Sequence, residues 1–424
     1  MSLQLPAPTA TNAAIWLIAA AATAGVILRP WRIGEAVWAS AGALVLLLAG
    51  LLPWTDAAHA VARGADVYLF LAGTMLLAEL ARREGVFDFL AVFAVRHSRG
   101  SATRLFTLLY GIGTVVTVLM SNDATAVVLT PAVCAVVRAA GAPALPYLLA
   151  CALIANAASF VLPISNPANL VVFGEHLPPL MPWLVQFAAP SAASILGTYG
   201  VLRVLHRREL GQPIESRIAP VELSPTGRLA LWGIGLVALA LLGASFRGIA
   251  LGAPTLLATL AVAAAIWLRK RESPGPALQG VAWSVLALVA GLFVLVEAMA
   301  RSGVIDALGR ALRDAAAVSV DATAWGAGVL LALACNLFNN LPAGLMAGSV
   351  ARIADVAVPI RSAIAIGIDL GPNLSVTGSL ATILWLIAIR RAGEQVTAWQ
   401  FFRVGTVAMP VALVLALAAL QVQS

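Results

Sequence analysis

Long apolar runs, separated by short polar segments that contain arginine, extend from one end of the chain to the other. A helix needs about 20 mainly apolar residues to cross a bilayer. The pattern therefore predicts about ten full membrane spans, near residues 13–28, 35–53, 66–83, 145–175, 182–205, 229–245, 250–268, 281–300, 361–390 and 399–421.

Two further apolar segments, residues 103–139 and 321–352, are each interrupted halfway by adjacent polar residues. The interruptions are Ser121-Asn122-Asp123 in the first segment and Asn339-Asn340 in the second. Backbone that leaves the helical path at membrane depth must be covered by protein or by a watery cavity. We therefore expect two re-entrant helical hairpins whose tips carry these polar residues.

Two of the predicted spans contain a helix break of their own. In the span 145–175, Pro167 can open the first turn of a second half-helix. In the span 361–390, Gly371 and Pro372 interrupt the helix. Side chains with an oxygen near the start of each second half can cap it, and they are Ser165, Asn166, Thr377 and Ser379.

Composition agrees with a membrane protein, because 61% of the residues are hydrophobic and only 11% are charged. No soluble globular class has this balance. The net charge of +7 comes from arginines in the connecting segments, so it is no sign of nucleic-acid binding. The positive-inside rule places the arginine clusters on the cytoplasmic side, which puts both termini outside. We expect an all-α polytopic membrane protein surrounded by lipid.

The chain contains an internal repeat. AGTMLLAELARREGVFDFL at residues 72–90 aligns without gaps on AGLFVLVEAMARSGVIDAL at 290–308, an offset of 218 residues with nine of nineteen positions identical. An odd number of spans separates the two copies, so we expect them to be inverted, as in secondary transporters. The predicted units are N-terminal scaffold helices 1–64, a first repeat 65–206, a cytoplasmic loop with linking helices 207–282, and a second repeat 283–424.

Inverted repeats with broken helices place a substrate site at mid-depth, where the copies meet. A lone Asn or Ser in a membrane helix is more often an interhelical hydrogen bond than a ligand contact. Four polar clusters in register with a duplication favour the site interpretation. The candidate substrate-binding residues are Ser121, Asn122, Asn156, Ser165, Asn166, Asn339, Asn340, Asn373, Thr377 and Ser379.

Acidic residues within the membrane are rare and are functional candidates by default. Asp123 and Asp369 lie at the interruptions without a basic partner nearby in sequence, so we expect them to carry protons. Burial favours the neutral form of a carboxyl group, which suits proton loading and release. Alternatively, Asp123 only caps the helix that follows it.

The remaining ionisable residues receive structural interpretations. We expect Glu79 to pair with Arg83 and Glu297 with Arg301, four residues further along a helix. The histidines are expected in loops and the cysteines as buried apolar residues, so we predict no metal site and no cofactor. These residues are His59, His97, His176 and His206, and Cys134, Cys151 and Cys335.

The motifs SNDATAVVLTP, SNPANLVVF, NNLPAG, IGIDLGPNLSVTGSLATILWL and FFRVG resemble those of the arsenite/antimonite efflux permeases, the ArsB type of the ion transporter superfamily. The resemblance covers most of the chain. It implies export of arsenite and antimonite in exchange for protons across a bacterial cytoplasmic (inner) membrane, with or without a separate soluble ATPase. It also implies a scaffold and a mobile transport domain with an elevator-like displacement.

The resemblance has one departure, because Asn156 stands where members of the family often have an acidic residue. This leaves proton carriage to Asp123 and Asp369. Arsenous acid is a neutral trihydroxide that amides and hydroxyls can recognise, and the candidate site has no cationic residue to bind a dicarboxylate. A sodium/proton antiporter or a small-anion transporter of the same superfamily remains the alternative.

Other classes fit the sequence less well. An intramembrane enzyme needs a nucleophile with a base, or a metal triad, at depth. A channel does not need inverted broken helices with ionisable groups. No Walker A motif occurs in the sequence, so ATP hydrolysis would belong to another chain.

Overall fold

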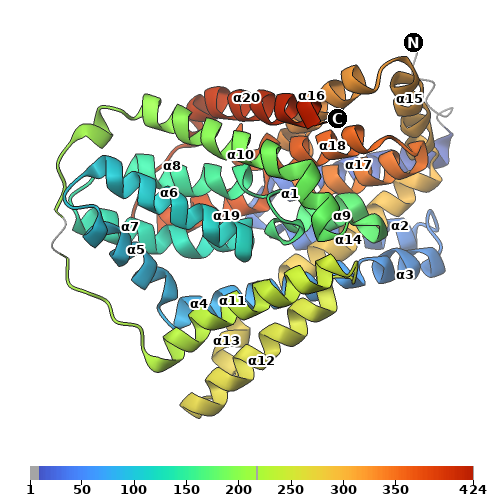
Figure 1. The fold of residues 1–424 in the computed structure, drawn as a ribbon. Coiled ribbons are helices and arrows are strands. Elements are labelled where there is room, and N and C mark those ends of the chain that lie inside the picture. Colours follow the sequence, from blue (N-terminus) through green and yellow to red (C-terminus); the bar gives the residue numbers. More distant parts are fainter. Residues whose placement is uncertain (1–8, 216–217, 424) are drawn as a thin grey trace.

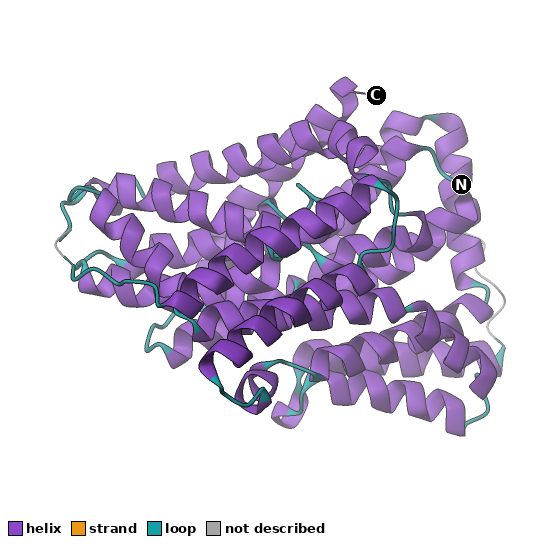
Figure 2. Ribbon diagram, turned by 60° about the horizontal axis from the view of Figure 1, so that its bottom comes forward, coloured by secondary structure: helices purple, strands orange, loops and turns teal. Residues whose placement is uncertain are grey.

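The computed structural model describes residues 9–215 and 218–423, and every regular element in these ranges is a helix (Figure 2). The expected all-α membrane protein is confirmed. Within the described ranges, eight helices are long and apolar enough to cross a membrane, and a ninth span results if the bent pair α3–α4 is counted as one. Two of the eight, α6 and α16, are arms of the predicted hairpins.

The first helices form one edge of the molecule. They are α1 (Ala10–Leu28), α2 (Glu35–Leu48) and α3 (Trp54–Arg63). The expected span 35–53 extends too far at its C-terminal end. Helix α2 stops at Leu48, and α3 starts as a separate helix after Pro53. Residues 1–8, which include most of the segment expected to place the N-terminus outside, lie beyond the described residues.

The first repeat begins with α4 and contains both a hairpin and a broken helix. Its elements are α4 (Ala65–Arg83), α5 (Val86–His97), α6 (Ala102–Leu119), a π-helical turn (Ala124–Leu129), α7 (Thr130–Ala139), α8 (Ala144–Ala157), α9 (Pro167–Phe173) and α10 (Leu180–Leu205). The hairpin is α6 with α7, and the broken helix is α8 with α9.

The second repeat has the same order of elements. They are α14 (Ser284–Arg301), α15 (Val304–Val318), α16 (Val320–Phe338), α17 (Asn340–Ala354), α18 (Val358–Leu370), α19 (Leu380–Arg391) and α20 (Ala398–Gln423). Between the repeats lie α11 (Pro225–Phe246), α12 (Gly252–Lys270) and the short α13 (Gly275–Gly280). The duplication expected from the 218-residue offset is therefore present in the fold.

The two copies run in opposite directions. Near the start of α4, Gly64 lies against Phe293 in the second half of α14. At the other end, Glu79 lies against Gly280, just before α14 begins. Since the start of α4 neighbours the end of α14 and the reverse also holds, these equivalent helices are antiparallel and the repeat is inverted.

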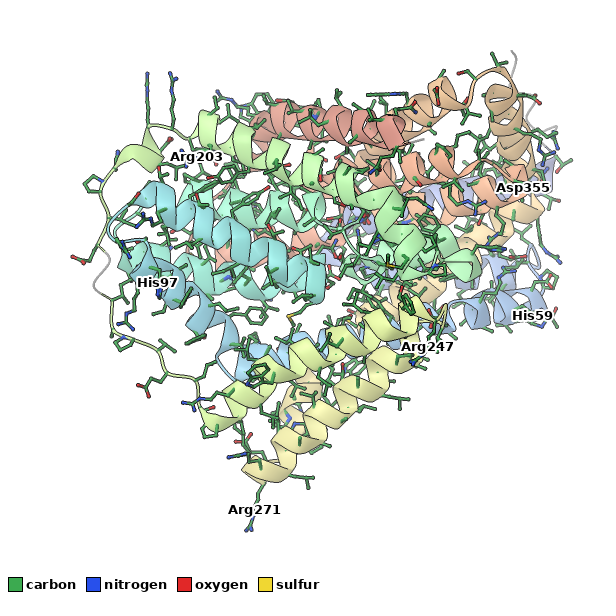
Figure 3. All side chains as sticks on the ribbon, viewed as in Figure 1. His59, His97, Arg203, Arg247, Arg271 and Asp355 are labelled. Carbon is green, nitrogen blue, oxygen red and sulfur yellow. The ribbon has the colours of Figure 1, made fainter. Side chains whose placement is uncertain are left out.

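The arginine-rich connections gather at one end of the molecule, which we call the basic end. The connection after α10 crosses earlier loops, with Ile214 N donating to Gly100 O at 3.0 Å and Glu215 N to Ala140 O at 2.9 Å. Arg138 pairs with Glu394 at 2.7 Å at the same end. Arg203 and His97 lie toward this end in Figure 3, whereas Asp355 and His59 lie at the opposite end.

The helices form two packed units. Helices α1–α4 and α11–α14 form the scaffold, and α6–α10 with α16–α20 form what we call the hairpin unit, in which α10 lies beside α20 (Figure 1). Glycines allow close helix contacts in the hairpin unit, since a Cβ on Gly367 of α18 would lie 2.2 Å from the carbonyl oxygen of Gly328 in α16. The core of the hairpin unit holds both helix breaks.

Candidate functional site

Each hairpin tip contains a residue with a positive φ angle. Ser121 (φ 155°) and Asn339 (φ 66°) both have positive φ, and they are equivalent positions under the 218-residue offset. Such a φ is strained for a residue with a side chain and is common at functional sites. Each arm of a hairpin therefore ends at a fixed, non-helical residue, with Asn122 or Asn340 directly after it.

Each broken helix restarts with a capped half-helix, as the sequence indicates. Helix α8 ends at Ala157, and Asn166 accepts a hydrogen bond from Ala168 N at 3.0 Å to cap α9, with Pro167 in its first turn. Helix α18 ends at Leu370, and Ser379 accepts from Thr382 N at 3.1 Å to cap α19. Thr377 and Ser379 are the two expected caps in the second break, and Ser379 is the residue that caps α19.

Hydrogen bonds join the two breaks across the repeats. The Asn166 side-chain amide donates to Asp369 Oδ1 at 2.7 Å, and Asn156 donates to Asn373 Oδ1 at 3.0 Å. The Asn373 amide in turn donates to the carbonyl oxygen of Leu153 at 3.0 Å. The structure thus brings together four of the predicted residues, all of them buried.

Each hairpin is also tied to the break of its own repeat. Ser165 donates to Val118 O at 3.1 Å in the first repeat, and Thr377 donates to Asn336 O at 3.0 Å in the second. Residues 118 and 336 are again 218 positions apart. In both repeats, therefore, a hydroxyl group of the break donates to the same carbonyl position near the end of the hairpin's first arm.

Sequence reasoning missed four polar residues of this region. Ser159 donates to Asn156 O at 2.8 Å, and Asn169 donates to Ser159 O at 2.9 Å. On α16, Asn336 donates to Gly371 O at 3.0 Å and accepts from Ser375 at 2.6 Å. Asn336 lies one turn before the hairpin tip. A polar residue at this position in an apolar run is the sequence feature that could have identified it as part of the site.

Several buried oxygens in this region have no hydrogen-bond donor among the described residues. They are Asn122 Oδ1, Asn156 Oδ1, Asn169 Oδ1 and Asp369 Oδ2. A buried acceptor without a donor costs about 1–3 kcal/mol. The polar cluster, which we define as Asn156, Ser159, Asn166, Asn169, Asp369 and Asn373, contains all of these oxygens except that of Asn122. It therefore favours a ligand that donates hydrogen bonds.

The predicted residues at the tips have no shown hydrogen bond to the polar cluster, and they are Ser121, Asn122, Asp123, Asn339 and Asn340. Asn122 and Asn340 are buried, yet no hydrogen bond between the described residues joins them. Asp123 is half-buried and makes no capping hydrogen bond to the helix after it. The alternative interpretation of Asp123 as a helix cap is therefore wrong for this structure.

The expected ion pairs within helices are also wrong. Glu79 pairs with Arg82 at 2.6 Å rather than with Arg83, since positions three and four residues further along a helix are both within reach. Glu297 pairs with Arg63 of α3, and Arg301 pairs with Asp56 of the same helix. The second pair of charges thus fastens α3 to α14, a long-range contact that spacing along one helix does not reveal.

The expectation that the histidines lie in loops is partly wrong. His59 lies within α3 and His97 is the last residue of α5 (Figure 3). The cysteines are buried as expected. Among the described residues, no group of three His, Cys, Asp or Glu side chains has a geometry that could hold a metal ion.

Comparisons with known proteins agree with this architecture. The chain is 28% identical to an arsenical pump membrane protein of Escherichia coli, over 93% of this chain and 95% of that protein. It is 27% identical to an arsenical pump membrane protein of Yersinia enterocolitica, over 82% of this chain and 83% of that protein. A putative arsenical pump membrane protein of Bacillus subtilis is 24% identical over 93% and 96%. The resemblance carried by the motifs is thereby confirmed.

Among solved structures, the YdaH transporter of Alcanivorax borkumensis is similar, with a TM-score of 0.56 and 16% identity over 87% of each chain. At this identity the likeness concerns the fold alone. A family model described as a citrate transporter, CitMHS, matches residues 15–389. Since this match spans most of the chain, the protein belongs to the CitMHS family and is a multi-pass membrane transporter rather than an enzyme.

Proposed function

We propose that this protein exports trivalent arsenic and antimony hydroxides from the bacterial cytoplasm in exchange for protons. The relatives named as arsenical pump membrane proteins support this class of cargo. The single observation that carries the proposal is the polar cluster, in which residues from both broken helices meet and present buried oxygens that lack donors.

The chemistry of the cluster suits a neutral trihydroxide. Arsenous and antimonous acids each offer three O–H donors, and Asn156 Oδ1, Asn169 Oδ1 and Asp369 Oδ2 are acceptors without a donor. Hydrogen bonds to such oxygens recover the free energy that burial costs them. A ligand of this kind is held reversibly, because it forms no bond to sulfur.

The family description raises citrate as another cargo. A trianion that leaves water needs cationic partners, most often arginine. The cluster consists of Asn, Ser and Asp side chains, and Asp369 would repel a carboxylate unless it carried a proton. The cluster therefore favours a neutral donor over citrate or another polyanion.

Proton coupling is assigned to Asp369, with Asp123 as a second carrier at the first hairpin tip. Asn166 holds one oxygen of Asp369 at 2.7 Å, while Oδ2 has no partner among the described residues. In the proposed cycle, Oδ2 accepts a hydrogen bond from the cargo on one side of the membrane. On the other side the cargo leaves and a proton takes its place, so a single group binds either the cargo or the proton.

Alternating access is proposed to occur by displacement of the hairpin unit along the scaffold. Part of the surface between the units is apolar, with Leu288 and Leu292 of α14 beside Leu341 and Leu380 of the hairpin unit. Ion pairs tie helices within a unit instead, as Lys270 with Glu84 does in the scaffold at 2.7 Å. An apolar interface lacks directional bonds that would have to break during sliding.

A sodium/proton antiporter is the second candidate, because carbonyl and carboxylate oxygens are also ligands for a hard cation. A separate soluble ATPase also remains a prediction. Such a partner would meet the basic end, where the connection between α10 and α11 lies.

Everted membrane vesicles test the proposal. When the vesicle interior is more acidic than the outside, vesicles that contain the protein should accumulate arsenite and antimonite. Dissipating the proton gradient should stop this uptake. Citrate and sodium ions, measured in the same vesicles, serve as the competing cargoes. Gradient-driven uptake of citrate or sodium with none of arsenite would replace the proposal by one of its alternatives.

A further inference from the structure

Two gaps of very different size separate the scaffold from the hairpin unit. The larger, at the end opposite the basic end, has a volume of about 450 Å³. The smaller lies toward the basic end beside Arg29 and Asn339, with a volume of about 10 Å³. The larger gap is wide enough for a small solute, whereas the smaller has room for only about one water molecule.

Contacts fix the position of the larger gap. It is lined by Arg63 at the end of α3, by Asp66 at the start of α4 and by Glu297 near the end of α14. Asp66 accepts a hydrogen bond from Gly252 N at 2.6 Å, at the start of α12. All of these lie away from the arginine-rich connections, so the positive-inside rule puts the gap on the outer side.

The charges around the gap balance. Two guanidinium groups, Arg63 and Arg352, line it together with two carboxylates, Asp66 and Glu297. Arg63 and Glu297 pair with each other. A mouth with no net charge does not concentrate anions or cations, and it lets a neutral polar solute pass without an electrostatic barrier.

A thin apolar floor separates the gap from the polar cluster. The floor contains Leu170 and Val171 of α9 and Leu345 of α17. Leu170 is four residues beyond Asn166, which is about 6 Å along a helix. Helices α9 and α17 touch directly here, because a Cβ on Gly348 would lie 2.4 Å from the carbonyl oxygen of Val172.

We infer that the structure represents an outward-facing arrangement with its gate closed, in which this gap is the exit vestibule for a neutral polyhydroxyl cargo. Leu170, Val171 and Leu345 form the gate between the vestibule and the polar cluster. The inference rests on the proposed transport function for the identity of the cargo. The openness of the vestibule and the position of the gate do not depend on that identity.

Cysteine accessibility tests which side is open. In a variant whose three native cysteines are replaced by alanine, Ser349→Cys places a thiol in the vestibule and Leu292→Cys places one in the small gap. A membrane-impermeant maleimide added to intact cells should label Ser349→Cys at least tenfold faster than Leu292→Cys. Faster labelling of Leu292→Cys, in cells or in everted vesicles, would overturn the outward-facing assignment.

The gate is tested with a reporter in the polar cluster. Ser159→Cys is buried and nearly conserves volume, so it should react slowly with the maleimide. Adding Leu345→Ala should speed its labelling from outside at least fivefold, whereas the matched change Leu341→Ala, beside the small gap, should not. Equal effects of the two changes, or none, would contradict the gate.

Separate controls test whether each variant is folded and whether the cargo is identified correctly. Elution of each variant as a single peak in detergent shows that it is folded, and Ala168→Cys is a second buried reporter if Ser159→Cys fails this control. These labelling experiments need no arsenite. If the labelling pattern is as expected but arsenite is not transported, the proposed cargo is wrong and the vestibule still holds. If arsenite is transported but the labelling pattern differs, only the vestibule is wrong.

Discussion

At the scale of single residues, the most informative contact is the hydrogen bond from Asn166 to Asp369, which joins the two repeats. The sequence predicts both residues as candidates, because each is polar at a helix break. It cannot predict that they meet, since 203 positions separate them and only tertiary packing brings them together. Ser159 and Asn169 were missed for a related reason, because nothing distinguishes them from ordinary polar residues near a helix end.

Replacing Asp369 with Asn tests proton carriage at this scale. The amide keeps the volume and can still accept from Asn166, but it cannot exchange a proton. We expect uptake of arsenite driven by a proton gradient to fall at least tenfold, and the remaining activity to lose its dependence on pH.

The control is Asp355→Asn, which removes the same charge from an exposed turn at the end of α17. It should transport like the wild type. An Asp369→Asn variant with an unchanged pH profile would remove this carboxyl group from the coupling mechanism.

At the scale of elements, hydrophobic periodicity predicts the long helices and both hairpins, because a polar pair within a long apolar run is costly unless the chain turns there. Helices α5 and α15 are absent from the expected spans. They are amphipathic, with Arg96 in one and Asp306 in the other, and are too short to cross a membrane. The pattern therefore identifies spanning segments better than the connecting helices between them.

Packing of the second hairpin against the broken helix gives a prediction at this scale. A Cβ at Gly367 would lie 2.2 Å from Gly328 O, so α16 and α18 must separate in Gly367→Ala. Overpacking of this kind costs about 1–3 kcal/mol. We expect a lower midpoint of thermal unfolding in detergent and a loss of transport.

Gly326→Ala is the matched control, because a Cβ at this position of α16 meets no atom within 4 Å. Its unfolding midpoint should stay close to that of the wild type. If both variants unfold at the same temperature, the close contact between α16 and α18 does not contribute to stability.

At the scale of the whole molecule, the internal repeat predicts the architecture. The 218-residue offset relates α4 to α14 and also the two strained tip residues, Ser121 and Asn339. An inverted duplication explains why both breaks end in one polar cluster. The sequence could not predict the unequal gaps beside the scaffold. A repeat in the sequence indicates that the two copies are related by symmetry, but it does not indicate how far the hairpin unit is shifted along the scaffold.

The most direct test of the central claim uses the purified protein alone in liposomes that contain a pH-sensitive dye. Arsenite added outside should enter while protons leave, and the dye should report an alkaline interior that disappears with Asp369→Asn. Arsenite entry without proton movement, or proton movement that persists in Asp369→Asn, would contradict the account that cargo and proton alternate at one cluster between the two inverted repeats.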